Sequence, residues 1–148
     1  MDAALTYLTA RMRTVREVEE KLDELQYGEG DILITVQRLK ELTLLDDEAY
    51  AREFVRTRLA TKAVSRQKLY MDLKAHKLPE ACIRAALDEL PRKTEEENAL
   101  LIARKYWRQM GELEEQTRRE RVLRRLMSRG FSTEASLSAI RQAAEEEP

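Results

Sequence analysis

Apolar residues recur at intervals of three or four along nearly the whole chain, and no segment shows the strict alternation of a half-buried strand. One such segment is marked by Val15, Val18, Leu22 and Leu25 and stops at the sequence Tyr-Gly-Glu-Gly, and the next is marked by Ile32, Leu33, Val36, Leu39 and Leu42. The other segments are marked by Leu5, Leu8 and Met12; by Tyr50, Phe54, Val55 and Leu59; by Leu69, Leu73 and Leu78; by Ile83, Ala86, Leu87 and Leu90; by Leu100, Ala103, Tyr106, Trp107 and Met110; by Val122, Leu123, Leu126 and Met127; and by Leu137 and Ile140. This spacing is that of amphipathic helices, so we predict an all-α fold.

These spacings repeat with a period near 50 residues. A shift of 51 residues carries Thr14, Val18, Leu22, Ile32, Val36 and Leu39 onto Ser65, Leu69, Leu73, Ile83, Leu87 and Leu90. A shift of 53 residues carries Leu69, Leu73, Leu78 and Leu87 onto Val122, Leu126, Phe131 and Ile140. We therefore predict three tandem three-helix repeats, at residues 1–42, 43–91 and 92–148. Because each repeat is too small to bury much surface alone, we expect them to stack into an elongated, curved array.

Local capping signals support these helix starts. The sequence Thr14-Val15-Arg16-Glu17 matches a capping box, in which the hydroxyl and the carboxylate each accept a backbone N–H of the other residue. The segment from Thr94 to Glu97 matches the same pattern. Ser65 and Ser132 also stand directly before helical runs, where an N-cap is needed.

The acidic pair Asp46–Asp47 could be either a metal or catalytic site or the start of a helix. No His or Cys lies nearby in the sequence, which makes the pair a poor metal site. If Asp46 is an N-cap, then Leu45 and Tyr50 occupy the two positions of a hydrophobic staple. We therefore interpret the pair as the start of a helix.

Composition narrows the class of protein. Hydrophobic residues make up 43% of the chain, charged residues 37% and aromatic residues only 5%, so we expect an aliphatic core and heavily solvated helices. The single Cys82 cannot form an internal disulfide, which fits a reducing cytosol. No apolar run is long enough for a signal peptide or for a membrane span of ~20 residues. We therefore expect a cytoplasmic protein.

Charge is segregated along the chain, although the net charge is only −1. Residues 51–77 contain eight basic residues and two acidic ones, and residues 118–129 contain six and one. Guanidinium groups at helical spacing can bind phosphates or carboxylates, but such runs can also be solvated faces with intrahelical ion pairs. The candidate residues for binding a partner or DNA are Arg52, Arg56, Arg58, Lys62, Arg66, Lys68, Arg118, Arg121, Arg124, Arg125 and Arg129.

The remaining reactive or aromatic side chains fit structural roles. His76 has no Ser, Cys or acidic partner in its local sequence, and we interpret it as a helix C-terminal residue. Tyr106 and Trp107 could stack on bases, but in an aromatic-poor chain they fit a core better, and Cys82 fits as buried filler. The chain contains no phosphate loop, zinc spacing or nucleophile–base pattern, so we predict no catalytic site, no metal and no cofactor.

Residues 44–90 combine several features in a fixed order. A Leu-Asp-Asp helix start is followed by an aromatic residue, an Arg-rich helix, a basic helix with Leu at four-residue spacing, and an Ile-x-x-x-Leu helix. Those parts are Leu45-Asp46-Asp47, Tyr50, Phe54-Val55-Arg56-Thr57-Arg58, Leu69/Leu73 and Ile83/Leu87. This stretch resembles the RecX family of regulators of the RecA recombinase, and so do residues 103–107 and 123–132, so the resemblance covers nearly the whole chain. The chain departs from the family at residues 61–65, where members commonly carry Gly-rich sequence, and at Lys77-Leu78, where they often have Lys-Gly.

The resemblance implies a helical-repeat modulator, most often an inhibitor, that binds in the groove of the RecA–DNA filament and restrains ATP hydrolysis and strand exchange. It implies a monomer that has RecA as its partner, contacts DNA through the filament, and does not associate with membranes. Two alternatives stay open. Three-helix units with a basic second helix also resemble helix-turn-helix modules of stand-alone DNA-binding proteins, although such a protein should be basic overall. A helical scaffold for an unrelated protein would have the same fold.

Overall fold

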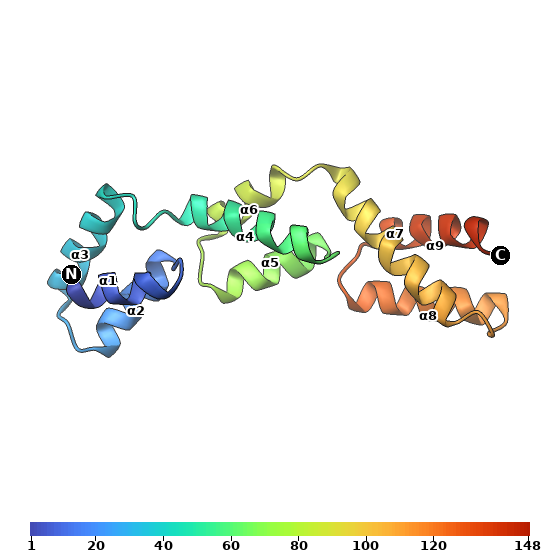
Figure 1. The fold of residues 1–148 in the computed structure, drawn as a ribbon, viewed down its shortest axis with the longest axis horizontal. Coiled ribbons are helices and arrows are strands. Elements are labelled where there is room, and N and C mark those ends of the chain that lie inside the picture. Colours follow the sequence, from blue (N-terminus) through green and yellow to red (C-terminus); the bar gives the residue numbers. More distant parts are fainter. The chain divides into compact units, whose positions relative to one another are not determined.

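The structure is a computed structural model that describes residues 1–148. It contains nine α-helices and no strand, which confirms the predicted all-α fold (Figure 1). The helices are α1 (Asp2–Ala10), α2 (Val15–Glu24), α3 (Glu29–Glu41), α4 (Asp47–Thr61), α5 (Arg66–Ala75), α6 (Glu80–Asp88), α7 (Arg92–Gln109), α8 (Glu115–Ser128) and α9 (Thr133–Glu146). No helix is both long enough and apolar enough to cross a lipid bilayer.

The chain forms two compact units. Unit 1 comprises residues 1–56 and 72–86, and unit 2 comprises residues 57–71 and 87–148. Helices α1–α3 therefore belong to unit 1 and helices α7–α9 to unit 2, while each of the helices α4, α5 and α6 contributes residues to both units.

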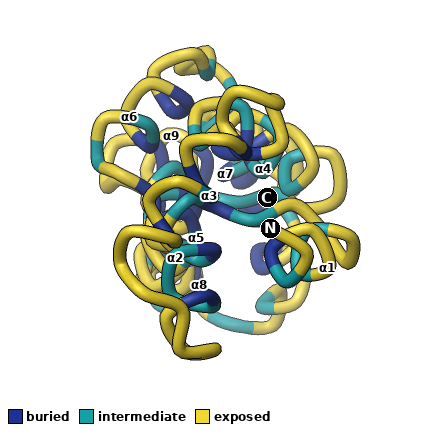
Figure 2. The backbone as a smooth tube through the Cα atoms, turned by 90° about the vertical axis from the view of Figure 1, so that its left-hand side faces the viewer, coloured by how far each residue is buried: buried dark blue, intermediate teal, exposed yellow.

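The core of helices α1–α3 is aliphatic. Its buried residues are Ala4, Val18, Leu22, Ile32, Val36, Leu39 and Leu45. Helix α2 packs against both α1 and α3. Because only one face of each helix meets the core, the buried positions form one stripe along it. Figure 2 shows the buried residues as short dark stretches of the backbone between exposed ones.

The core of helices α7–α9 contains small and aromatic residues. Its buried members are Ala99, Ala103, Tyr106, Trp107, Val122, Leu126, Phe131, Ala135, Ala139, Ile140, Ala143 and Ala144. Alanines on both α7 and α9 let these two helices approach closely, and they form the most extensive helix pair of the chain. Trp107 is 2% exposed, and its indole N–H donates to the carbonyl of Glu147 at 2.6 Å. The prediction that Tyr106 and Trp107 belong to a core is confirmed.

Most of the predicted caps are present. The Thr14–Glu17 capping box has both hydrogen bonds, at 3.2 and 2.9 Å. The Ser132 hydroxyl accepts the N–H of Ala135 at 3.1 Å, and the Asp46 carboxylate accepts the N–H of Ala49 at 3.0 Å. The acidic pair therefore begins a helix, as predicted.

The predicted capping box at Thr94–Glu97 is wrong. Helix α7 begins at Arg92 with Pro91 at the N-cap, so Thr94 lies inside the first turn. The φ of Pro91 is −62°, the value to which the ring restricts any proline, and a residue with no N–H suits a helix start. The proline thus starts the helix upstream of the threonine.

The second helix of each group of three is followed by a residue with left-handed backbone. The φ angle is 69° at Gln26, 63° at Lys77 and 90° at Gly130. These positions follow α2, α5 and α8, and the intervals between them are the same 51 and 53 residues that relate the apolar positions. After α8 the N–H of Phe131 returns to the carbonyl of Leu126 at 3.2 Å, as in a Schellman motif.

A side-chain hydrogen bond repeats with nearly the same period. In unit 1 the hydroxyl of Thr14 donates to the carbonyl of His76 at 2.8 Å, and in unit 2 the hydroxyl of Ser65 donates to the carbonyl of Arg129 at 2.8 Å. We call these contacts the first junction and the second junction. Both hydroxyls are fully buried, and each also accepts the N–H three residues ahead in its own helix. One hydroxyl thus caps its helix and binds the end of the equivalent helix in the next group.

Candidate binding site

The eleven predicted basic residues do not form one surface. Arg52 and Arg56 belong to unit 1, and the other nine belong to unit 2. Arg52 is exposed on α4, and Arg56 forms an exposed ion pair with Glu53 at 2.5 Å. An exposed intrahelical pair of this kind contributes little to stability and can be replaced by a ligand at small cost.

Arg118 is buried, although the sequence made it a candidate for binding a partner or DNA. It is 8% exposed, and its Nε and Nη2 donate to the carbonyl of Trp107 at 2.9 and 2.5 Å. Its guanidinium carbon lies 3.8 Å from the centroid of the Trp107 ring, in a cation–π contact. The carbonyl and the ring satisfy this charge inside unit 2, so Arg118 is a structural residue and not an exposed contact.

Arg66 also binds backbone carbonyls. Its Nη2 donates to the carbonyl of Leu87 at 2.6 Å, and its Nη1 lies 3.4 Å from the carbonyl of Leu90. These carbonyls belong to the last turn of α6 and the residues after it, which lack partners within the helix. Arg66 therefore caps the end of that helix.

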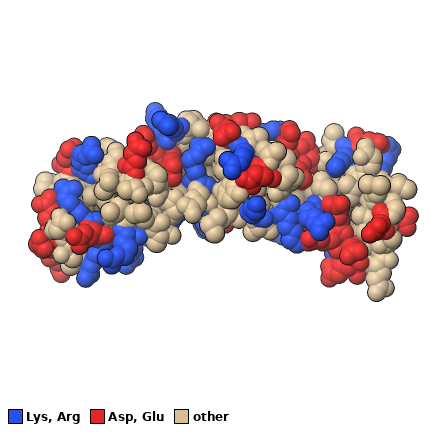
Figure 3. All heavy atoms as spheres, turned by 180° about the vertical axis from the view of Figure 1, so that it is seen from behind, with Lys and Arg blue, Asp and Glu red and all other residues tan.

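Three arginines remain exposed along α8, namely Arg121, Arg124 and Arg125. None of them has a carboxylate at ion-pair distance, whereas Arg119 on the same helix pairs with Glu115 at 3.1 Å. Figure 3 shows that basic side chains gather in groups on the face it presents, with acidic groups between them. The three arginines offer guanidinium groups that an anionic partner could reach.

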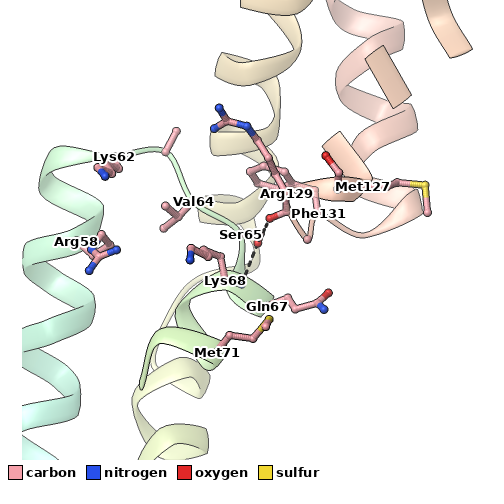
Figure 4. A pocket seen from close by; sticks show the side chains of 13 residues that line it. Arg58, Lys62, Val64, Ser65, Gln67, Lys68, Met71, Met127, Arg129 and Phe131 are labelled. Atoms are coloured by element: carbon pink, nitrogen blue, oxygen red, sulfur yellow. Dashed lines mark hydrogen bonds between the residues drawn. The ribbon is translucent and has the colours of Figure 1, made fainter. Parts of the chain in front are cut away.

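The remaining four predicted residues line one pocket of unit 2. Arg58 and Lys62 come from the end of α4, Lys68 from the first turns of α5, and Arg129 from the end of α8. We call this the basic pocket, and Figure 4 shows these side chains around it. Its volume is about 510 Å³, and no lining residue is acidic. The fold thus brings cations of both basic segments of the sequence to one place.

The second junction forms part of the wall of the basic pocket. The N–H of Lys68 donates to the Ser65 hydroxyl at 3.1 Å, and that hydroxyl donates to the Arg129 carbonyl (Figure 4). A Cβ atom on Gly130 would lie 2.7 Å from the same hydroxyl oxygen. Position 130 therefore needs glycine for two reasons, namely its left-handed φ and the lack of space for a side chain. A wall fixed in this way is preorganised for a ligand.

Two exposed methionines complete the pocket. Met71 is 59% exposed and Met127 is 47% exposed, and both line the basic pocket together with Val64 and Phe131. Neither methionine was predicted as a contact residue. The only sequence signal for such a role is that each lies one helical turn from a basic position.

Unit 1 contains a polar cluster that the sequence analysis also missed. The Nδ1 atom of His76 lies 3.2 Å from the Glu17 carboxylate and 3.0 Å from the Tyr50 hydroxyl. Glu17 is 59 residues away from His76, so no local pattern could reveal it. Burial, together with the nearby negative charge of Glu17, raises the pKa of Tyr50. His76 holds the first junction through its carbonyl and this cluster through its ring.

Asp47 makes a contact that its predicted place at the start of α4 does not reveal, and Cys82 differs from its predicted role. Asp47 accepts the N–H of Val15 at 2.9 Å, so it caps α2, while Asp46 caps α4. Burial raises the pKa of Asp47 above its usual value. Cys82 is only half-buried, and burial followed by the charge of Asp47 raises the pKa of its thiol, which disfavours a reactive thiolate.

Family models and known relatives match the chain along its length. Models of the first, second and third three-helix domains of RecX match residues 1–39, 46–87 and 94–140. Regulatory protein RecX of Streptomyces coelicolor is 32% identical over 144 residues, which covers 97% of this chain and 76% of the relative. Regulatory protein RecX of Limosilactobacillus reuteri is 30% identical over 129 residues, which covers 87% of this chain and 49% of the relative. The chain thus spans between about half and three quarters of the length of these relatives.

Solved structures agree with the family models. The crystal structure of RecX from Lactobacillus salivarius superposes with a TM-score of 0.92 at 26% identity, covering 97% of this chain and 94% of that one. A second structure, of a regulatory protein RecX, superposes with a TM-score of 0.81 at 28% identity and covers 93% of this chain. The prediction that the chain consists of three three-helix repeats is therefore confirmed, and the three repeats match the three RecX domains. The chain belongs to the RecX family of regulatory proteins.

Proposed function

We propose that this protein inhibits a RecA-type recombinase by binding as a monomer in the groove of the RecA–DNA filament, where it restrains ATP hydrolysis and strand exchange. The observation that carries the proposal is the match of all three domains to the RecX family, whose members are named as regulatory proteins. The distribution of charge in unit 2 agrees with an anionic partner of this kind.

Two basic surfaces of unit 2 would contact the filament. One is the basic pocket, and the other is the row of Arg121, Arg124 and Arg125 on α8. Guanidinium and ammonium groups bind phosphates and carboxylates without reading a base sequence. Because the net charge of the chain is −1, these surfaces would give little affinity for naked DNA, and the filament would supply the remaining contacts.

The direct test is the rate of DNA-dependent ATP hydrolysis by RecA. Substoichiometric amounts of this protein should lower that rate, because one molecule bound along the groove contacts several RecA subunits. Filament binding is measured in parallel by co-sedimentation. An unchanged rate together with absent co-sedimentation would refute the proposal.

Charge reversal on α8 tests the contact surface. The double variant Arg121→Glu/Arg125→Glu should weaken filament binding by at least roughly tenfold, since rim charges act on both association rate and affinity. The control matched in charge is Lys93→Glu/Lys105→Glu, which changes two exposed cations on α7 outside both basic surfaces. Far-ultraviolet circular dichroism should be the same for all three proteins. Equal loss in the control would show that net charge matters and the α8 row does not.

A stand-alone DNA-binding protein is the second candidate, and the exposed arginine row on α8 is the observation in its favour. It predicts tight binding to naked double-stranded DNA with a steep dependence on salt, in the absence of RecA. Filament binding that is no tighter than naked-DNA binding would support this candidate over the first.

A further inference from the structure

We propose that the basic pocket binds an acidic segment of a partner protein in which carboxylates flank one aliphatic side chain. The inference deepens the proposed function, because it names the chemistry of the protein segment, and it relies on that function only for the identity of the partner. Three features of the pocket support it: its charge, its apolar wall and its lack of an accessible aromatic ring.

The charge of the pocket selects an anion. Four cationic side chains line it without an acidic one, and they come from three different helices or helix ends. Lys62 and Arg129 are exposed and form no ion pair. Convergent cations in a concave site raise the local concentration of an anionic ligand more than the same cations on a flat surface. The charge alone would suit a phosphate as well as a carboxylate.

The apolar wall separates these two ligands. Met71 and Met127 are exposed residues of the pocket lining, and Val64 lies between the basic residues (Figure 4). Exposed methionines are typical of surfaces that bind apolar peptide side chains, because the unbranched thioether adapts to different shapes. A phosphodiester backbone would leave these methionines without an apolar partner, whereas a leucine or isoleucine would cover them.

Aromatic stacking is the usual way in which a protein holds a single-stranded base. The one aromatic ring of the pocket, Phe131, is only 3% exposed, so its face is not open to a base. The volume of about 510 Å³ is enough for one or two side chains of a peptide. These observations favour a short acidic peptide over a nucleic acid.

The test uses the methyl groups of the five methionines as probes. The full-length protein is labelled with ¹³C-methyl methionine and titrated with acetyl-Glu-Asp-Leu-Glu-Asp-amide, and separately with a short oligothymidylate and with inorganic phosphate. The peptide should shift the methyl signals of Met71 and Met127 but not those of Met1 and Met12, which belong to unit 1. The same peptide with Ser in place of Leu should bind more weakly.

Variants then locate the charge. Lys62→Gln/Arg129→Gln should weaken peptide binding by roughly tenfold, and the matched control Lys93→Gln/Lys105→Gln, which also removes two charges, should leave it unchanged. Shifts caused by the oligothymidylate or phosphate but not by the peptide would overturn the proposal, as would the absence of any shift. The RecA ATP-hydrolysis assay is independent of this titration, so inhibition of RecA without peptide binding would remove the inference and leave the proposed function standing.

Discussion

The first and second junctions share one hydrogen bond but differ in what surrounds it. At the first junction the Thr14 hydroxyl donates to the His76 carbonyl, and the ring of the same histidine contacts the Glu17 carboxylate and the Tyr50 hydroxyl. At the second junction the Ser65 hydroxyl meets the Arg129 carbonyl, and the contact borders the open basic pocket. The same hydrogen bond therefore recurs in both units, while the surrounding positions diverge to give a polar side-chain cluster in unit 1 and the basic pocket in unit 2.

The left-handed residue after the second helix differs in the same way. At the first junction this residue is Lys77, whose side chain pairs with Glu20. At the second junction it is Gly130, where any Cβ would meet the Ser65 hydroxyl. The first junction thus accommodates a side chain that the second excludes, so the wall of the basic pocket is packed more closely at this point.

The largest expected effect is that of Gly130→Ala. The substitution places a side chain in left-handed backbone and 2.7 Å from the Ser65 oxygen, which is fixed by two hydrogen bonds. Strain and overpacking together should lower the free energy of unfolding by about 2–4 kcal/mol. Urea unfolding followed by the fluorescence of Trp107, the only tryptophan, reports this loss for unit 2.

Two further variants sharpen this result. Gln26→Ala keeps a side chain at an exposed left-handed position of unit 1 and should change stability by less than about 0.5 kcal/mol. Ser65→Ala removes the oxygen that the new methyl group would meet. The double variant Ser65→Ala/Gly130→Ala should therefore lose less free energy of unfolding than the sum of the two single variants. Strict additivity would contradict the proposed clash.

The next effect comes from removing the hydroxyl groups themselves. Thr14→Val and Ser65→Ala each delete a helix cap and leave a carbonyl without its donor, so each should cost about 2 kcal/mol. The matched control is Ser132→Ala, which removes only a cap, from α9, and should cost about 1 kcal/mol. Urea denaturation followed by circular dichroism measures all three. Equal losses in the three variants would show that the junction hydrogen bonds add nothing beyond capping.

Much of this fold follows from local sequence. The apolar spacing locates the helices, because burying one face of each helix is the main source of their stability. The capping box at Thr14 and the N-caps at Asp46 and Ser132 were predictable because both partners of each hydrogen bond lie within three residues. The prediction failed at Thr94, where Pro91 offered an equally local start signal further upstream.

The binding site was predictable only in part. Arg118 matched the helical spacing of an exposed arginine, but its carbonyl partner is 11 residues earlier, on another helix, and depends on how α7 and α8 pack. Lys62 and Arg129 line the same pocket although they are far apart in the sequence. Charge counts identified both basic segments, but only tertiary packing decides which cations meet and which are buried.

The smallest expected effect concerns Asp47 at the start of α4. Its carboxylate accepts the N–H of Val15, and burial raises its pKa in the folded chain. A raised folded pKa means that the folded state binds this proton more tightly than the unfolded state. The stability gained in this way is fully present below the unfolded pKa and is lost as the pH rises through the folded pKa. At neutral pH the ionised carboxylate therefore carries a burial cost that an amide would not carry.

Asp47→Asn keeps an oxygen acceptor for Val15 and removes that cost. As the pH rises from acid to neutral, the free energy of unfolding of the variant should increase relative to that of the native chain, by about 0.3 kcal/mol. The effect is small because water screens a half-exposed carboxyl. Urea unfolding of both proteins at acid and neutral pH measures the change. If the difference in unfolding free energy between the two proteins is the same at acid and neutral pH, burial of Asp47 does not affect its titration.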